Sequence, residues 1–224
     1  MLELQHLDAW RDDRCLYRDL TVTLPAGAVL QVAGVNGAGK TTLLHTVAGL
    51  RAPDAGRVCW RGVDRRDDPE AMQRDLLFLG HLPGLKASLS VQENLRFLAA
   101  CRGLRLSAAL LDRALERVGL AGCEDAPVAQ LSAGQRRRVA LARLFTEPVP
   151  LWVLDEPFTA IDRDGVAAIE TWVADHAEAG GSVLLTTHHA LSLRCPLAQL
   201  TLQRRVDDDM LADDDSADDD GALP

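Results

Sequence analysis

The sequence of 224 residues predicts an α/β fold with a largely parallel sheet, and three patterns lead to this prediction. A short apolar strand at 29–33 runs through a glycine-rich turn into a helix at 42–48. Two continuous apolar segments, 151–154 and 182–186, have the composition of strands that are buried on both faces. Between them, 164–179 alternates apolar and polar residues at helical spacing. A strand, a crossover helix and another strand in this order are typical of parallel sheets.

The remaining segments extend this core in chain order. Alternating apolar positions at the start of the chain predict antiparallel edge strands, and a further short strand is expected at 57–60. The apolar segment 76–79 is another strand candidate. From residue 90 to about residue 144, apolar residues spaced at three and four predict helices. We therefore expect one domain over residues 1–206, with an antiparallel β edge and an inserted helical subdomain at about 86–146.

The charge of the chain is concentrated at its C-terminal end. Nine aspartates lie within 207–220, and the rest of the chain has equal numbers of acidic and basic residues. Such a run repels itself and buries no apolar surface, so we expect residues 207–224 to form a disordered acidic tail. A functional acidic arm is the alternative. The absence of a basic surplus elsewhere argues against a nucleic-acid partner.

Other features of the composition indicate a cytosolic protein. The sequence has no run of about 18 apolar residues, which a membrane-spanning helix would need. Its first residues lack the basic and apolar regions of a signal peptide. The cysteines form no C-x-x-C pair and are expected to be reduced thiols. They are Cys15, Cys59, Cys101, Cys123 and Cys195.

The glycine-rich turn fits the phosphate-binding pattern G-x-x-x-x-G-K-[ST]. Its glycines let backbone N–H groups wrap closely around phosphates, while the helix N-terminus and Lys40 add positive charge. Thr41 supplies a hydroxyl of the kind that holds Mg²⁺. A purely structural turn would not need a lysine and a hydroxyl directly after its last glycine. We predict that a nucleoside triphosphate is bound by Gly34, Val35, Asn36, Gly37, Ala38, Gly39, Lys40, Thr41 and Thr42.

Two carboxylates follow the apolar segment 151–154. The carboxyl edge of an α/β sheet is where ligands bind, so Asp155 is predicted to hold Mg²⁺ through water. Glu156 is predicted to orient or deprotonate the attacking water. Two acidic residues alone are equally compatible with an ordinary turn. In combination with the phosphate loop they favour catalysis.

The segment Leu131-Ser132-Ala133-Gly134-Gln135, which a basic helix follows, resembles the signature motif of ABC-type ATPases, a class of P-loop NTPases. Its serine precedes Asp155 by 23 residues, as in that family, while Ala133 stands where glycine is most usual. The serine is also a plausible helix N-cap, and a helix N-terminus is an anion site. The resemblance implies that a nucleotide held by another copy is contacted by Ser132, Gly134 and Gln135.

The same resemblance suggests roles for single residues. His188 is similar to the switch histidine that contacts the γ-phosphate, and His189 is the less favoured alternative. Asp162 lies in a segment that resembles the D-loop, which crosses to the partner copy. Trp10 stands where the family stacks an aromatic ring on adenine, with Tyr17 as the alternative.

His81 stands where the family has a glutamine that touches Mg²⁺ and water and faces the membrane partner. A neutral imidazole accepts one hydrogen bond but offers no amide oxygen, which calls the metal contact at this loop into question. A pH-sensitive coupling loop is one hypothesis for His81, and simple packing at the cleft rim is the alternative.

The segments 80–86, 130–144 and 154–162 resemble the haem-exporter ATPase of bacterial cytochrome c maturation. The resemblance implies an ATP- and Mg²⁺-dependent ATPase on the cytoplasmic face of the inner membrane, peripheral and bound to integral-membrane subunits. Its turnover would be coupled to release of haem-loaded chaperone. The alternatives are the ATPase of another small-molecule or lipid exporter, a soluble ABC ATPase acting in translation or DNA maintenance, and a binding module without turnover. The presence of Glu156 and His188 disfavours the last.

A phosphate loop and a signature helix on one chain cannot meet around the same nucleotide. The sequence therefore implies a head-to-tail homodimer with two ATP molecules, each between Lys40 of one copy and Ser132 of the other. Catalysis would depend on Lys40, Glu156 and His188.

Overall fold

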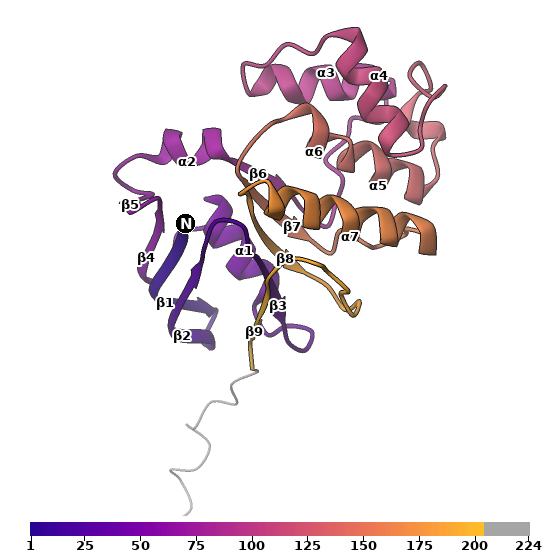
Figure 1. Cartoon of the computed structure of the whole chain (residues 1–224). Coiled ribbons are helices and arrows are strands. Elements are labelled where there is room, and N and C mark those ends of the chain that lie inside the picture. Colours follow the sequence, from indigo (N-terminus) through magenta and orange to yellow (C-terminus); the bar gives the residue numbers. More distant parts are fainter. Residues whose placement is uncertain (204–224) are drawn as a thin grey trace, which may run out of the picture.

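The structure, a computed structural model, describes residues 1–203. The acidic segment 207–224 and the end of the predicted domain at 204–206 lie outside these residues. The described residues form two sheets with helices packed against them (Figure 1). The prediction of an α/β fold with an antiparallel edge is confirmed.

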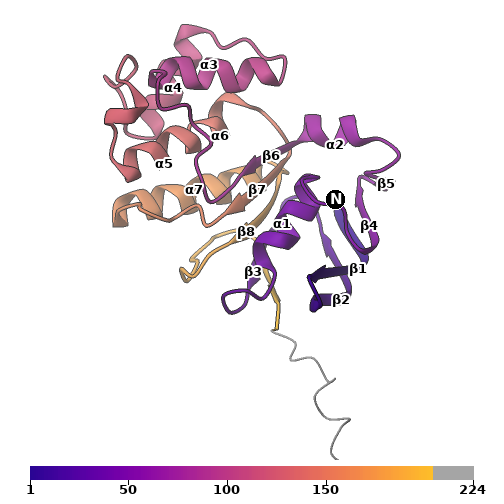
Figure 2. The same cartoon turned by 180° about the vertical axis from the view of Figure 1, so that it is seen from behind.

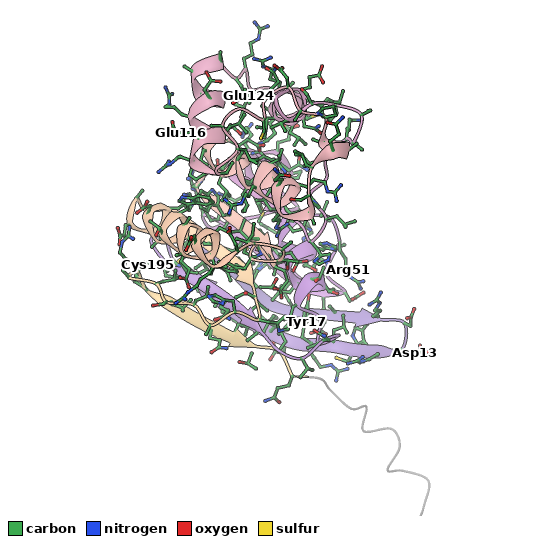
Figure 3. The ribbon with its side chains drawn as sticks, turned by 90° about the vertical axis from the view of Figure 1, so that its right-hand side faces the viewer. Asp13, Tyr17, Arg51, Glu116, Glu124 and Cys195 are labelled. Carbon is green, nitrogen blue, oxygen red and sulfur yellow. The ribbon has the colours of Figure 1, made fainter. Side chains whose placement is uncertain are left out.

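The first sheet is antiparallel and contains the N-terminal strands in the order β2-β1-β4-β5. Its strands are β1 (Leu2–Arg11), β2 (Arg14–Leu24), β4 (Ala55–Trp60) and β5 (Val63–Asp64). The hairpin between β1 and β2 has Asp13 at its tip, at the opposite end of the molecule from Glu116 and Glu124 (Figure 3). This hairpin therefore projects from the core on the side away from the helical lobe.

The second sheet is parallel, in the order β6-β7-β8-β3-β9. Its strands are β3 (Val29–Ala33), β6 (Leu76–Leu79), β7 (Leu151–Asp155), β8 (Ser182–Thr186) and β9 (Leu197–Thr201). The register pairs Asp155 with Thr186, so the last residues of β7 and β8 are neighbours. The carboxyl ends of these parallel strands meet at one edge of the sheet, as predicted for the site.

The helices fall on both faces of this parallel sheet. They are α1 (Lys40–Ala48), α2 (Pro69–Asp75), α3 (Val91–Cys101), α4 (Ala108–Arg117), the short 3₁₀ helix η1 (Val128–Gln130), α5 (Ala133–Leu141), α6 (Arg143–Thr146) and α7 (Arg163–Glu178). Helices α3 to α6 form a lobe beyond β6 and β7, and α7 lies between this lobe and β8 (Figures 1 and 2). These four helices lie within the range 86–146 that the sequence suggests for the insert.

The parallel sheet separates two apolar cores. Along β7, Trp152 and Leu154 pack with the helical lobe and α7, while Leu151 and Val153 pack with α1 and the antiparallel sheet. None of these four side chains is more than 4% exposed. Successive side chains of a strand face opposite sides, so an uninterrupted apolar segment is what such a central strand requires. Packing on both faces fixes the position of the acidic residues that follow.

Three elements were not predicted from the sequence: the two-residue strand β5, strand β9 and helix α2. Strand β9 is mostly exposed and pairs with β3 on one side only, so its sequence lacks the apolar pattern of a buried strand. Helix α2 is short, although Asp68 caps it and Pro69 begins it.

All five cysteines are free, as predicted, and Cys101 at the end of α3 is the exposed one.

Candidate functional site

A cavity of about 450 Å³ opens at the carboxyl edge of the parallel sheet. It gathers residues that are distant in the chain: the phosphate loop, the ends of β6, β7 and β8, and the β1–β2 hairpin. Six residues to which the sequence analysis gives functional roles line it together: Lys40, Thr41, His81, Asp155, Glu156 and His188. Asn36, Gly37, Gly39 and Thr42 of the loop also line it. The structure thus brings the predicted phosphate, metal and base residues to one place.

A larger hollow of about 870 Å³ lies where β6 and β7 begin, at the edge of the sheet opposite the phosphate loop. Its lining comes mainly from α2, the end of α3 and the start of α6. It contains none of the site residues predicted from the sequence. Size alone would favour this hollow, but the chemistry of its lining does not match any of the motifs, so the smaller cavity is the candidate site.

The phosphate loop has the backbone geometry that its glycines predict. Gly39 has a φ of 97°, in the left-handed region, and a Cβ at this position would lie 3.1 Å from the Cβ of Leu16. Only glycine meets both conditions without strain. Gly39 is the N-cap residue of α1, and no side chain caps this end of the helix. The N–H groups of the first helical turn therefore face the loop. The ammonium of Lys40 donates to the carbonyl oxygens of Gly34 and Val35, at 2.6 and 3.2 Å, which holds it across the loop.

Asp155 connects the phosphate loop with the neighbouring strand. Its Oδ2 accepts a hydrogen bond of 3.1 Å from Thr41 Oγ1, and its Oδ1 accepts one of 2.6 Å from Thr186 Oγ1. The residue is 3% exposed, so both oxygens are held in fixed directions. A hydroxyl and a carboxylate at this spacing are suitable for Mg²⁺, which takes few protein ligands and completes its shell with water and phosphate oxygens. Within residues 1–203 no group of three or more His, Cys, Asp or Glu could hold a metal ion by itself.

Glu156 has the environment of a general base. Its backbone is left-handed, with a φ of 49°, and its N–H donates to Thr186 Oγ1 at 2.9 Å. Its Oε1 is buried and forms no hydrogen bond within the described residues. The closest basic group is Nε2 of His188, 3.5 Å away, which is too long for a full hydrogen bond. A buried carboxylate oxygen with free lone pairs, in the wall of this cavity, is available to accept a proton from water.

The residues of the predicted signature motif lie outside the cavity of their own chain. Ser132 is exposed and caps α5, since its Oγ accepts from Gln135 N at 3.2 Å while its N–H donates to Gln135 Oε1 at 2.9 Å. A Cβ at Gly134 would lie 2.7 Å from the carbonyl oxygen of Ala160, so this position needs a glycine for close packing. Ala133 is exposed, and its methyl group is therefore tolerated where glycine is more usual. The exposed end of α5 is free to contact another molecule.

Asp162 also lies outside the cavity and has partners within its own chain. Its carboxylate accepts from Gly165 N at 3.1 Å, which caps α7, and pairs with Arg138 at 2.6 Å. The pair joins α5 to the segment before α7. Its expected role at the partner copy therefore remains a prediction.

The aromatic residues proposed for adenine do not line the cavity. Trp10 is half-buried, and the guanidinium of Arg18 lies 5.3 Å from its ring centroid. Tyr17 is 5% exposed, and its ring packs in the core beside Gly39, which corrects the alternative that it stacks on adenine. Arg11 and Leu16, on the same hairpin, do line the cavity.

Three cavity residues were not among the predicted site residues: Arg11, Leu16 and Thr159. Arg11 and Leu16 are the chain neighbours of Trp10 and Tyr17, which were the residues proposed for adenine, and they lie on the paired strands β1 and β2. Thr159 follows the carboxylates by three positions, a spacing that could have suggested it. Arg137, described below, also escaped the sequence analysis. Its spacing of three and four from the buried Ala140 and Leu141 is the signal that could have identified it.

The chain matches the family described as ABC transporter over residues 17–159, more than half of its length. A Yersinia pestis protein named cytochrome c biogenesis ATP-binding export protein CcmA is 51% identical over 191 residues, which cover 85% of this chain and 87% of that protein. A protein of the same name from Methylococcus capsulatus is 49% identical over 196 residues, which cover 88% of this chain and 95% of that protein.

Solved structures show the same fold. A putative ABC transporter ATP-binding protein from Pyrococcus furiosus has a TM-score of 0.78 at 27% identity, over 90% of this chain and 96% of that one. The dimeric structure of the bacterial ABC transporter cassette MJ0796 has a TM-score of 0.81 at 22% identity, over 91% of this chain and 95% of that one. None of the helices described within residues 1–203 is both long enough and apolar enough to cross a membrane.

Proposed function

This chain belongs to the ABC transporter family, and on this premise we propose that it is the ATP-hydrolysing subunit of a membrane complex that serves cytochrome c biogenesis. The observation that carries the proposal is the arrangement of Glu156 beside Asp155 and Thr41. A buried carboxylate with an unpartnered oxygen lies in the same cavity as a hydroxyl–carboxylate pair suited to Mg²⁺. Relatives that are about half identical over most of their length, and that are named for cytochrome c biogenesis, support the choice of complex.

The residues of the cavity divide the hydrolysis of ATP between them. Lys40 and the N–H groups of the phosphate loop bind the phosphates and neutralise the charge that develops on them. The oxygen of a water molecule attacks the γ-phosphorus while Glu156 accepts a proton from that water. The bond between the γ-phosphorus and the bridging β-phosphate oxygen breaks, and this oxygen leaves with ADP. His188 is close enough to Glu156 to orient the same water or to contact the γ-phosphate. Thr41 and Asp155 would hold Mg²⁺, which when bound would help to neutralise the negative charge of the phosphates.

A homodimer supplies what a single copy lacks. The exposed end of α5, with Ser132, Gly134 and Gln135, does not line the cavity of its own chain. In a head-to-tail pair, each α5 would face the nucleotide held by the other copy, and its N-terminal N–H groups would bind the γ-phosphate. ATP then stabilises the closed pair, and hydrolysis allows the pair to open. The dimeric form of the cassette MJ0796 is compatible with this arrangement.

The membrane subunits are proposed to dock beside His81. Leu82 is 79% exposed and Phe97 on α3 is 43% exposed, so two large apolar side chains lie at the surface near this loop. The ammonium of Lys86 lies 4.8 Å from the ring centroid of Phe97, which packs the loop against α3. A protein partner that covers these side chains would be in position to sense changes at His81 in the cavity wall. In our proposal the chain acts at the inner face of a bacterial plasma membrane, with release of haem-loaded chaperone as the coupled event, and the relatives named for cytochrome c biogenesis support this choice.

Replacement of Glu156 tests the catalytic part of the proposal. Glu156→Gln is expected to lower the turnover of ATP by about 10²–10⁴-fold, because the amide no longer accepts a proton. ATP should still bind, and the dimer should persist in size-exclusion chromatography with ATP. Glu116→Gln, on the exposed face of α4, is the matched control. Turnover of Glu156→Gln close to wild type would exclude Glu156 as the base.

A pull-down from solubilised membranes tests the choice of complex. Wild-type chain is expected to recover haem-handling membrane proteins, identified by mass spectrometry and haem absorbance. Leu82→Glu should reduce recovery at least about tenfold, because it puts a charge where the membrane partner would cover an apolar side chain. Leu50→Glu, at a residue that is 64% exposed elsewhere, should not. Recovery of an unrelated permease would leave the ATPase standing and remove the cytochrome c assignment.

A further inference from the structure

A buried arginine on α5 reaches from the helical lobe into the parallel sheet. Arg137 is 3% exposed, and its guanidinium donates hydrogen bonds to four backbone carbonyl oxygens. Nη1 donates to Gly80 at 2.8 Å, and Nη2 donates to Asp155 at 2.8 Å. Nη2 also donates to Glu156 at 2.7 Å, and Nε donates to Pro157 at 3.3 Å. One side chain therefore joins α5, the residue after β6 and the turn that follows β7.

Within residues 1–203 the guanidinium of this arginine forms no ion pair with a carboxylate. All of its hydrogen bonds in the described part of the chain go to carbonyl oxygens. Burial lowers the pKa of Arg137 from its usual value, and the charges of Asp155 and Glu156 counteract this effect. Burying a cation costs free energy, and an apolar side chain of similar volume often packs as well or better. The geometry that Arg137 imposes is therefore a better explanation for its presence than stability.

The backbone that Arg137 holds is strained. Glu156 has a φ of 49°, a left-handed backbone conformation that is unfavourable for a residue other than glycine. The N–H of Glu156 donates to Thr186 Oγ1 at 2.9 Å. The carbonyl of Glu156 accepts from Arg137 Nη2 at 2.7 Å. Such a conformation persists only where neighbouring groups determine it. The carbonyl of Glu156 also accepts from Thr159 N at 3.2 Å within the same turn. Of these contacts, Thr186 and Arg137 are the two that tie the direction of the Glu156 side chain to other elements of the fold.

We propose that Arg137 is a positioning residue for Glu156, which it holds in the left-handed backbone conformation and links to the orientation of α5. This inference rests on the proposed function, in which Glu156 is the base. Helix α5 begins directly after Ser132, which in the proposed dimer faces the nucleotide of the other copy. A movement of α5 on closure would reach the turn of Glu156 through the guanidinium. The same side chain holds Gly80, immediately before His81, so the cavity wall on that side would move with it.

The test compares Arg137→Gln and Arg137→Lys with a matched arginine elsewhere. Arg102 also donates to three backbone carbonyls, those of Gln73, Arg74 and Leu76, at 2.9 to 3.0 Å, but at the opposite edge of the sheet. Unlike Arg137, it also pairs with a buried carboxylate, that of Glu147 at 3.2 Å. We expect Arg137→Gln to lower kcat for ATP at least about tenfold while the Kd for ATP changes less than about threefold. Arg102→Gln should lower the thermal unfolding temperature and leave kcat unchanged well below that temperature. Lysine at 137 keeps the charge without the planar fork of donors, so only partial recovery of kcat is expected.

A double variant separates positioning from general destabilisation. If Arg137 acts through Glu156, adding Arg137→Gln to Glu156→Gln should change the residual turnover less than about twofold. Effects that multiply, or wild-type kcat in both Arg137 variants, would overturn the inference. Loss of ATP binding together with kcat in both variants would overturn it as well, since it would indicate collapse of the site. Wild-type turnover of Glu156→Gln alone would instead overturn the proposed function.

Discussion

Thr186 donates its hydroxyl hydrogen to Oδ1 of Asp155 at 2.6 Å, and the same hydroxyl oxygen accepts the N–H of Glu156 at 2.9 Å. One buried side chain on β8 thus holds the proposed metal carboxylate and the backbone of the proposed base. The parallel register of β7 and β8 makes this possible, because it pairs Asp155 with Thr186.

Thr186→Val is expected to impair catalysis and folding together. Valine keeps the shape of threonine but leaves a buried carboxylate oxygen and a buried N–H without partners, which costs about 1–3 kcal/mol of unfolding free energy. The concentration of Mg²⁺ needed for half-maximal turnover should rise, because Asp155 is no longer oriented. Urea unfolding and Mg²⁺ titration of the ATPase measure the two effects. Thr171→Val, which removes an exposed hydroxyl on α7, is the control, and an equal response of both variants would contradict this account.

Arg11 is expected to contribute more to nucleotide binding than Trp10. Arg11 lines the cavity, whereas the ring of Trp10 does not line it and lies beside Arg18. A guanidinium plane stacks on a purine ring or binds phosphate, so Arg11→Ala should raise the Kd for ATP about tenfold. Trp10→Ala should raise it less than about twofold. Equilibrium titration with a fluorescent ATP analogue measures both, and the reverse ranking would support an aromatic adenine site at Trp10.

Two inactive variants should restore each other when mixed. Lys40→Ala removes the phosphate-loop cation of one copy, and Ser132→Arg blocks the signature end of the other. In a head-to-tail pair both defects fall in one site and the second site is intact. Random mixing then yields about a quarter of wild-type turnover per chain, since half of the pairs are mixed. Failure of the mixture to exceed either variant alone would argue against sites shared between copies.

The stability of the fold should decrease in mild acid through His176. Its ring stacks on Trp152, with centroids 3.8 Å apart, and burial lowers the pKa of His176 below the usual 6.5, an effect that the carbonyl of Pro150 partly offsets. The unfolded chain therefore binds this proton at a higher pH than the folded chain. The contribution of the neutral His176 to the free energy of unfolding is fully present above about pH 6.5, the unfolded pKa. It is lost as the pH falls through the lower pKa of His176 in the folded chain.

His176→Phe keeps an aromatic ring against Trp152 and removes the titration. The decrease in unfolding free energy between about pH 7.5 and pH 5, from urea titrations, should be smaller in this variant than in wild type. His81→Asn is the control, because His81 is exposed and forms no ion pair within residues 1–203. A pH dependence in His176→Phe equal to that of wild type would show that other groups cause it.

The sequence predicted best the strands that are buried on both faces and the amphipathic helix that packs against them. Strands β6, β7 and β8 and helix α7 were located almost to the residue, because burial imposes a continuous or periodic apolar pattern. Strand β9 was missed because an exposed edge strand needs no such pattern. Its residues pair with β3 through backbone N–H and C=O groups, which every residue except proline carries whatever its side chain.

The site was predictable to the extent that its residues form contiguous motifs. The phosphate loop and the carboxylates after β7 carry their chemistry in local order, so spacing alone indicated them. Arg11 and Arg137 contribute through contacts made only after folding, across a hairpin and between a helix and two strand ends. A basic residue near a motif has no local signal that distinguishes a buried guanidinium from a solvated one. Tertiary packing makes that distinction.

The exposed Cys101 provides a place to observe the helical lobe. Burial raises the pKa of the Cys59 and Cys195 thiols, so these two form little reactive thiolate at neutral pH, and Cys15 is also buried. A maleimide fluorophore should therefore react first at the end of α3, without any engineered cysteine. Its polarisation would then follow rotation of the lobe during a single turnover, and the wild-type chain would serve as its own reporter.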